Sequence, residues 1–306
     1  MTDTSNISPE ERREREEFLI GGHDRILTPE QQLEQLSTYI AAHNEAPAKN
    51  PPWPDNPSDK EAIDTFDARL PDRITHACML MLGSALGHTM PGVAFIDGVT
   101  TEDVPELGGQ IIRPANPSGA WAISLHPGGW WKGSGVALDN AWRPEVAAVA
   151  NLSGVTFLDL DYPLVPEHTL GRVVATGTRA AQWVRDNQQP TALFAWGYSS
   201  GGALTTLTHS LWDAQALTFP HLDLTGLPPE VVGEVSFPDA AQFPPTLMQV
   251  ASNDAIAGHY PWAEEPEQVR VQEYVSEHRV STPEVARQRV RDVAEFFAHQ
   301  AAQHSA

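Results

Sequence analysis

The chain has very little cysteine and no long apolar run. Cys78 is the single cysteine in 306 residues, so neither an internal disulfide nor a Cys-x-x-Cys metal site can form. This usage suits a reducing compartment, and we expect a cytoplasmic protein. Residues 1–17 are polar and charged, which argues against an ordinary secretory signal. The longest apolar stretch, around residues 77–86, is too short to span a bilayer.

Positive charge is also scarce. The chain has 40 acidic and 19 basic residues, a formal net charge of −21, so we expect neither nucleic acid nor an anionic membrane surface as a partner. Solubility is the simplest reason for such a charge. The sequence contains no G-x-G-x-x-G, no G-x-x-x-x-G-K-[ST] and, despite 12 histidines, no H-E-x-x-H. We therefore expect no nucleotide cofactor and no metal.

What the chain does contain is a serine between glycines after an apolar run. Residues 192–196 read Ala-Leu-Phe-Ala-Trp, and residues 197–202 read Gly-Tyr-Ser-Ser-Gly-Gly. A strand that turns sharply into a helix places the serine at the apex, with an exposed hydroxyl and a strained backbone. Such a turn leaves no room for a β-carbon at the flanking glycines. The pattern predicts that Ser199 is a nucleophile, and an ordinary glycine-serine loop is the alternative.

A pair of glycines follows another predicted strand. Residues 121–131 read Trp-Ala-Ile-Ser-Leu-His-Pro-Gly-Gly-Trp-Trp. Adjacent glycines after a strand let two backbone N–H groups point into a cleft, as stabilisation of an oxyanion requires. The predicted donors are the N–H groups of Gly128, Gly129 and Ser200, whereas Pro127 has no N–H. The alternative is a glycine-rich turn that the two tryptophans stabilise.

Three segments together resemble the hormone-sensitive-lipase-like branch of the α/β-hydrolases. Residues 126–130, His-Pro-Gly-Gly-Trp, are similar to that family's His-Gly-Gly-Gly followed by an aromatic residue. Residues 161–168, Asp-Tyr-Pro-Leu-Val-Pro-Glu-His, are similar to Asp-Tyr-Arg-Leu-Ala-Pro-Glu-His, and residues 197–202 to Gly-Asp-Ser-Ala-Gly-Gly. The likeness extends from about residue 90 to the C-terminus. It implies the α/β-hydrolase fold and a serine esterase.

The chain departs from that family's pattern at three positions. Pro127 replaces the first glycine of the triplet, but the family's donors are the next two residues. Tyr198 replaces the usual acid before the nucleophile, a change that bears on how the turn is braced. Pro163 replaces an arginine, with no consequence assigned. In this family the counterparts of His126 and His168 are structural, and we expect neither to be catalytic.

The nucleophile needs an acid and a base, which follow it in that order in this fold. Residues 246–251 form a predicted strand that leads into Ser-Asn-Asp, so Asp254 is the expected acid. Asp223 is the second candidate and Asp239 the third. In the alternative interpretation Asp254 merely begins a turn or caps a helix.

The expected base is His278. It follows residues 269–275, which alternate as a half-buried strand does, and the family's catalytic histidine occupies this place. The less suitable histidines are His259, His299 and His304. A surface histidine on a loop is the alternative, because Arg279 and Val280 stand where the family has Gly-Phe.

Strands that alternate with helical segments predict an α/β fold with a mainly parallel sheet. The expected strands lie near residues 93–97, 108–113, 120–126, 155–161, 192–198, 246–251 and 269–275. The expected helices cover about 8–20, 28–43, 70–87 and 283–300, and a loop or linker covers 44–57. We expect an N-terminal helical cap over residues 1–88 and a catalytic domain over 89–306, in one compact unit.

These residues predict a two-step acyl transfer by Ser199, with a small-molecule ester as substrate. We expect Trp130, Trp131 and Tyr198 to line the substrate pocket, with the tryptophans narrowing the acyl side and favouring short-chain esters. Hydrolysis of an amide or thioester by the same residues is one alternative. A catalytically idle receptor for a small molecule is another. The oligomeric state stays open, a homo-oligomer included.

Overall fold

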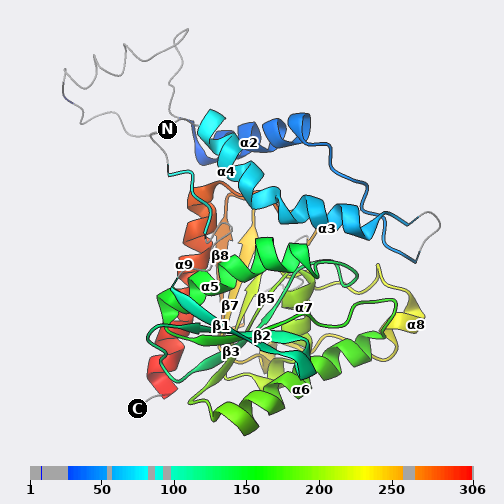
Figure 1. The fold of residues 1–306 in the computed structure, drawn as a ribbon, viewed down its shortest axis with the longest axis vertical. Coiled ribbons are helices and arrows are strands. Elements are labelled where there is room, and N and C mark those ends of the chain that lie inside the picture. The colour runs from blue at the N-terminus through cyan, green and yellow to red at the C-terminus, as the bar shows by residue number, and fades with distance from the viewer. Residues whose placement is uncertain are drawn as a thin grey trace.

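The computed structural model describes Ser8 and residues 27–53, 57–81, 87–91, 98–257 and 266–304. Within these ranges one sheet of eight strands has the order β1-β2-β4-β3-β5-β6-β7-β8 (Figure 1). Its strands are β1 Val99–Val104, β2 Gly109–Pro114, β3 Trp121–Leu125, β4 Thr156–Leu160, β5 Leu193–Tyr198, β6 Ala214–Thr218, β7 Thr246–Ala251 and β8 Val269–Tyr274. The pairs β1–β2 and β2–β4 are antiparallel, and all the other pairs are parallel.

Helices cover both faces of the sheet, which is why its central strands are apolar throughout. Every residue of β3 and β4 is buried. Alternate side chains enter different cores: Ile123 packs in the cluster that includes α6 and α7, and Ala122 in the cluster that includes α5 and α9. These helices are α5 Arg143–Ser153, α6 Leu170–Gln188, α7 Ser200–Leu207 and α9 Pro283–His304.

Three N-terminal helices lie together at the top of Figure 1, next to the ends of the strands where the loops of the site emerge. They are α2 Pro29–His43, α3 Lys60–Ala68 and α4 Leu70–Met81. Thr28 and Gln31 form a capping box that begins α2. Ile40 and Ile74 pack with Ala286 of α9, so this layer is joined to the main body through an apolar cluster.

The expected fold class is confirmed, and so are the strands near 108–113, 120–126, 155–161, 192–198, 246–251 and 269–275. The expected helix over 8–20 and the expected strand over 93–97 lie outside the described residues. Of the helix expected over 70–87, the structure describes residues 70–81 as α4 and places 87–90 outside any helix. The starts expected for α2 and α9 are confirmed.

Two strands, β1 and β6, were not expected. The edge strand β1 is largely exposed, so its residues read as a polar loop. Strand β6 includes Gln215, which is fully buried and donates to the Thr246 hydroxyl over 3.1 Å. A buried polar side chain with a partner in the next strand cannot be recognised before the partner is known.

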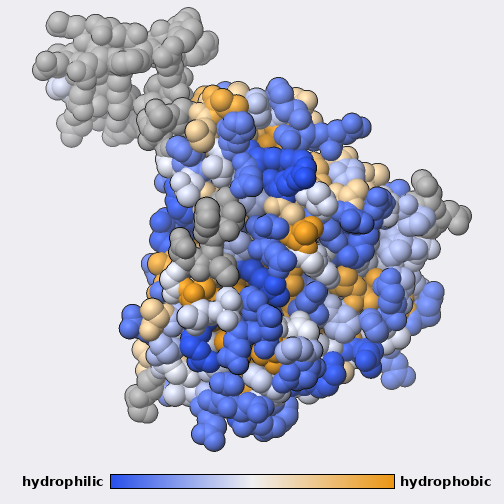
Figure 2. All heavy atoms as spheres, viewed as in Figure 1, coloured by the Kyte–Doolittle hydropathy of each residue, from blue (hydrophilic) through white to orange (hydrophobic). Residues whose placement is uncertain are grey.

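The surface reflects the acidic composition. Figure 2 shows one face of the molecule covered mostly by hydrophilic side chains, with smaller hydrophobic areas between them. Among the described residues, no helix combines the length and the apolar character that a membrane crossing requires.

Candidate active site

The site begins at the turn between β5 and α7. Ser199 occupies it with φ 55° and ψ −117°, and its N–H donates to the Thr218 carbonyl over 2.9 Å. A β-carbon on Gly197 would lie 2.1 Å from the carbonyl oxygen of Gly201, and one on Gly201 would lie 2.0 Å from that of Leu125. Both glycines are therefore required by close backbone approach, as the sequence predicted. A strained backbone at a serine is typical of a nucleophile held in a sharp turn.

The structure brings Ser199, His278 and Asp254 into one hydrogen-bonded row. His278 lies in the loop between β8 and α9, and its Nε2 is 2.9 Å from Oγ of Ser199. Its Nδ1 is 2.7 Å from Oδ2 of Asp254, which follows β7. Ser199 and His278 are each only 5 % exposed. The serine is thus less open than the turn pattern predicts, because the imidazole lies against its hydroxyl.

The other carboxylate oxygen of Asp254 is fixed by the backbone. Oδ1 accepts the N–H of Ile256 over 2.8 Å and that of Ala257 over 2.7 Å. Burial by itself would raise the pKa of Asp254, but the hydrogen bond and charge of His278 and these two N–H groups lower it below its usual value. The acid therefore stays ionised and oriented toward the imidazole.

Burial lowers the pKa of His278 below the ordinary value, and the nearby Asp254 carboxylate only partly opposes this shift. The ring is therefore neutral at pH 7. The hydrogen-bond network assigns the proton to Nδ1, which donates to Asp254, and leaves Nε2 to accept from the Ser199 hydroxyl. This protonation state is the one that a general base needs.

The glycine loop lies beside this row and has an unusual backbone. Gly128 and Gly129 have φ 149° and 61°, and a β-carbon on Gly128 would lie 1.8 Å from the Lys132 carbonyl oxygen. The segment over residues 161–168 supports the loop: the Tyr162 hydroxyl donates to the His126 carbonyl over 2.7 Å. The fully buried His126 ring stacks on that of Tyr162, with centroids 4.1 Å apart.

Tyr198 connects the nucleophile turn to the histidine loop. Its hydroxyl donates to the backbone carbonyl of His278, a residue 80 positions away in the chain. Burial raises the pKa of Tyr198, so the hydroxyl keeps its proton and remains a donor. Tyr198 also lines a cavity beside the site, as expected for a pocket residue. Where the resembled family has an acid before its nucleophile, this chain has a tyrosine that holds the loop of His278.

The tryptophans are placed differently from the expectation. Trp130 and Trp131 are 2 % and 7 % exposed, pack in the apolar cluster that includes β3 and α6, and are not among the residues that line the cavity beside the site. The N–H of Val165 donates to the Trp130 carbonyl over 3.0 Å, which fixes the loop with the indole in the core. The loop lies against the cavity through Gly128, and the role expected for the tryptophans on the acyl side stays a prediction.

A charged cluster that sequence reasoning missed joins α3 to both catalytic loops. The carboxylate of Asp67 forms ion pairs with Lys132 at 2.8 Å, with Lys49 at 3.3 Å and with Arg279. Lys132 belongs to the glycine loop, and Arg279 follows His278. Burial would raise the pKa of Asp67, but the three cations lower it well below its usual value. Burial together with the charge of Arg279 lowers the pKa of Lys132 to about 8.

The alternative acids and bases serve local structure. Asp223 accepts from the N–H of Thr225 and Asp239 from that of Ala241, each two positions further along. His299 contacts Gln303, and His304 contacts the Gln300 carbonyl, within α9. His259 lies outside the described residues.

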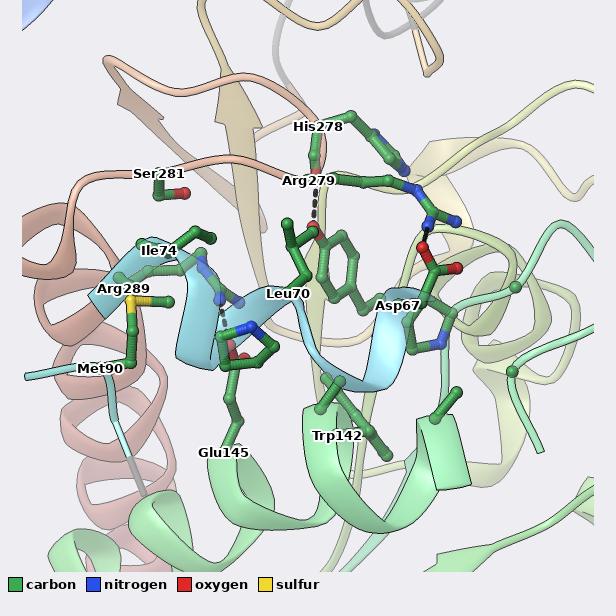
Figure 3. Close-up of a pocket in the computed structure, with 18 of the residues that line it drawn as sticks. Asp67, Leu70, Ile74, Met90, Trp142, Glu145, His278, Arg279, Ser281 and Arg289 are labelled. Carbon is green, nitrogen blue, oxygen red and sulfur yellow. Dashed lines mark hydrogen bonds and ion pairs between the residues drawn. The ribbon is translucent and has the colours of Figure 1, made fainter. Parts of the chain in front are cut away.

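A cavity of about 100 Å³ adjoins the row (Figure 3). Asp67, Leu70 and Ile74 of the N-terminal helices line it, as do Gly128 and His278 of the two catalytic loops. Its lining therefore combines the helical layer with the proposed reaction centre.

The fold is that of the α/β-hydrolases, and comparisons with known proteins agree. A family model for the alpha/beta hydrolase fold matches residues 122–232. The chain is similar to a hyperthermophilic esterase from the archaeon Pyrobaculum calidifontis, with 20% identity, a TM-score of 0.56, and coverage of 79% of this chain and 92% of that one. The comparison with curated proteins gave no match.

Two further solved structures have a similar fold. An esterase/lipase from an uncultured bacterium has 17% identity and a TM-score of 0.60, with coverage of 90% of this chain and 100% of that one. A hormone-sensitive lipase from a metagenome library has 16% identity and a TM-score of 0.59, with coverage of 90% and 99%. The chain thus has the α/β-hydrolase fold that its three sequence segments implied.

Proposed function

We propose that the chain is a serine carboxylic-ester hydrolase that acts through an acyl-enzyme. The observation that carries this proposal is the unbroken row from Ser199 Oγ through the His278 ring to Asp254, with contacts of 2.9 and 2.7 Å. The esterases among the similar structures support the choice of an ester as substrate.

In the first step Nε2 of His278 takes the hydroxyl proton as Oγ of Ser199 attacks the ester carbonyl carbon. Asp254 stabilises the imidazolium that forms. The N–H groups of Gly128, Gly129 and Ser200 are the proposed donors to the tetrahedral oxyanion. Collapse of the intermediate transfers the proton to the leaving alcohol, and water then repeats the sequence on the acyl-enzyme.

We further propose that α2, α3 and α4 act as a cap and that the substrates are short-chain esters. The ion pairs of Asp67 with Lys132 and Arg279 support the first point, because they fix α3 to the loops of the oxyanion and the base. The small cavity of about 100 Å³ beside His278 supports the second, because a short chain is sufficient to fill it.

The test is substitution of the nucleophile. Ser199→Ala should remove nearly all hydrolysis of p-nitrophenyl acetate and all labelling by a fluorophosphonate, with an unchanged circular dichroism spectrum. Ser252→Ala is the matched control, because Ser252 is exposed and should keep both activities. A Ser199→Ala protein that hydrolyses the ester like the wild type would refute the assignment.

Substrate panels separate the remaining alternatives. A series of p-nitrophenyl esters should be hydrolysed best at short chain lengths, and an optimum at ten carbons or more would contradict the short-chain proposal. Matched amides and thioesters should react more slowly than the ester. Ligand binding without labelling of Ser199 would indicate a receptor rather than an enzyme.

A further inference from the structure

A buried ion pair lies in the wall of the cavity. Arg289 of α9 donates from Nη2 to Oε1 of Glu145 in α5 over 2.6 Å, and both side chains line the cavity (Figure 3). Arg289 is 4 % exposed and Glu145 9 %. The surrounding walls are apolar, from Leu70, Ile74, Met90, Ala137, Ala141 and Ala286.

This pair is only half satisfied by the protein. Nε and Nη1 of Arg289, Oε2 of Glu145 and Nε1 of Trp142 are buried atoms that form no hydrogen bond with the described residues, and all three residues line the cavity. Buried polar atoms in folded proteins nearly always have a partner. The three residues all line one cavity, so an occupant of that cavity is the candidate partner for the atoms that remain unpaired.

The pair is close to the reaction centre. The centre of the Tyr198 ring lies 5.4 Å from Cζ of Arg289 and 5.6 Å from the centre of the His278 ring. Cζ of Arg289 and the His278 ring are therefore at most 11.0 Å apart. The cavity also reaches Gly128 of the proposed oxyanion loop. An ester whose carbonyl lies at Ser199 and whose arm enters the cavity beside Gly128 would bring that arm toward Arg289.

The charges determine which chemical group fits. A carboxylate would be attracted by Arg289 and repelled by Glu145. An ammonium would be repelled by Arg289 and attracted by Glu145. An uncharged group that both accepts and donates hydrogen bonds satisfies both residues at once. A hydroxyl and a carboxamide have this property, whereas an alkyl terminus leaves all these polar atoms without a partner.

We propose that the cavity is a specificity subsite for a terminal hydroxyl or carboxamide on one arm of the ester, with Arg289 as donor and Glu145 as acceptor. This inference rests on the proposed ester hydrolysis and names the substrate class for it. Sites that hydrogen-bond a substrate hydroxyl discriminate strongly against the analogue that lacks it, because their polar groups are then left unpaired.

The experiment compares matched esters with and without a terminal hydroxyl, from five to eight carbons. One series carries it on the acyl arm, such as p-nitrophenyl 6-hydroxyhexanoate against the hexanoate. The other carries it on the alcohol arm, such as 6-hydroxyhexyl acetate against hexyl acetate. In at least one series the hydroxyl should raise kcat/KM by about tenfold or more. Equal values for every matched pair would overturn the proposal and indicate that the cavity holds only water.

Variants link the preference to the ion pair. Glu145→Gln leaves the cation unopposed, so preference should shift toward a half-ester with a terminal carboxylate. The double variant Glu145→Leu with Arg289→Met replaces the pair by apolar groups of similar size, a change that buried pairs often tolerate. It should bring the ratio between hydroxylated and alkyl esters close to one. Gln288→Leu, on an exposed position of α9, should leave the ratio unchanged. A preserved ratio in the double variant would refute the subsite.

Two readouts keep this proposal separable from the proposed function. Fluorophosphonate labelling of Ser199 in each variant reports whether the reaction centre is folded. Calorimetric binding to the Ser199→Ala protein measures the subsite without catalysis: the methyl ester of 6-hydroxyhexanoic acid should bind more tightly than methyl hexanoate. Equal binding refutes the subsite even if hydrolysis is established. Tighter binding supports it even if hydrolysis fails.

Discussion

Replacing Tyr198 by Phe tests whether the residue before the nucleophile positions the base. The substitution removes only the hydroxyl, which donates to the His278 carbonyl. The ring contacts stay, including those with Trp142 and Phe219 at centroid distances of 6.2 and 5.7 Å. The perturbation is thus confined to the brace between the nucleophile turn and the loop of the base.

The expected size of the effect follows from the burial of the hydrogen bond that is removed. A buried carbonyl that loses its donor costs about 1–3 kcal/mol. Without the brace the imidazole is no longer fixed beside Ser199. If this raises the activation free energy by about 1.4 kcal/mol, kcat falls about tenfold. The KM should change little, since the ring that lines the cavity is kept. The free energy of unfolding should fall by about 1–2 kcal/mol.

Steady-state kinetics with p-nitrophenyl acetate and urea unfolding measure both effects. Tyr274→Phe is the matched control: it removes another buried tyrosine hydroxyl, which donates to Asp292 over 2.5 Å and accepts from Gln249. It should lower stability to a similar extent with little loss of kcat. An unchanged kcat in Tyr198→Phe, or equal losses in both variants, would refute the positioning role.

Three further predictions concern the turn, the cap and the base. Gly201→Ala should cost about 3 kcal/mol or more of stability and most of the esterase activity, because its β-carbon would lie 2.0 Å from the Leu125 carbonyl oxygen; wild-type urea unfolding would contradict this. Asp67→Asn should destabilise the fold by about 3–5 kcal/mol at pH 7, because Lys132 and two further cations lose their buried counter-ion; an unchanged unfolding midpoint would exclude it. The reaction needs neutral His278, whose pKa burial lowers, so kcat/KM should decline at low pH with a midpoint below pH 6.5; a midpoint above pH 6.5 would argue against the assigned base.

Local patterns in the sequence were sufficient to predict the structure wherever neighbouring residues determine the backbone conformation. The turn around Ser199 could be predicted because Gly197 is required by its close approach to Gly201 within one strand-turn-helix unit. The contact that requires glycine at 201 is with Leu125 of β3, which only the fold brings there. The buried central strands were equally clear, because a strand covered on both faces is a continuous apolar run. The exposed edge strand β1 and the polar residues of β6 gave no such signal.

The relation between distant residues was decided only by the fold. The sequence placed Asp254 and His278 after strands, but the distances of 2.7 and 2.9 Å depend on how β5, β7 and β8 align in the sheet. The brace from Tyr198 and the burial of Trp130 likewise depend on loops that meet only after folding.

The sequence by itself determined six strands of the sheet, the sharp turn and the residue types that hydrolysis would need, because these follow from periodicity and short-range sterics. The tertiary structure alone decided which charges share a site. Lys49, Asp67, Lys132 and Arg279 form one cluster, and Glu145 and Arg289 form a half-satisfied pair, although the chain separates them by many residues. The physical reason is that burial and pairing of charges are properties of packed surfaces, and a linear pattern does not encode which surfaces meet.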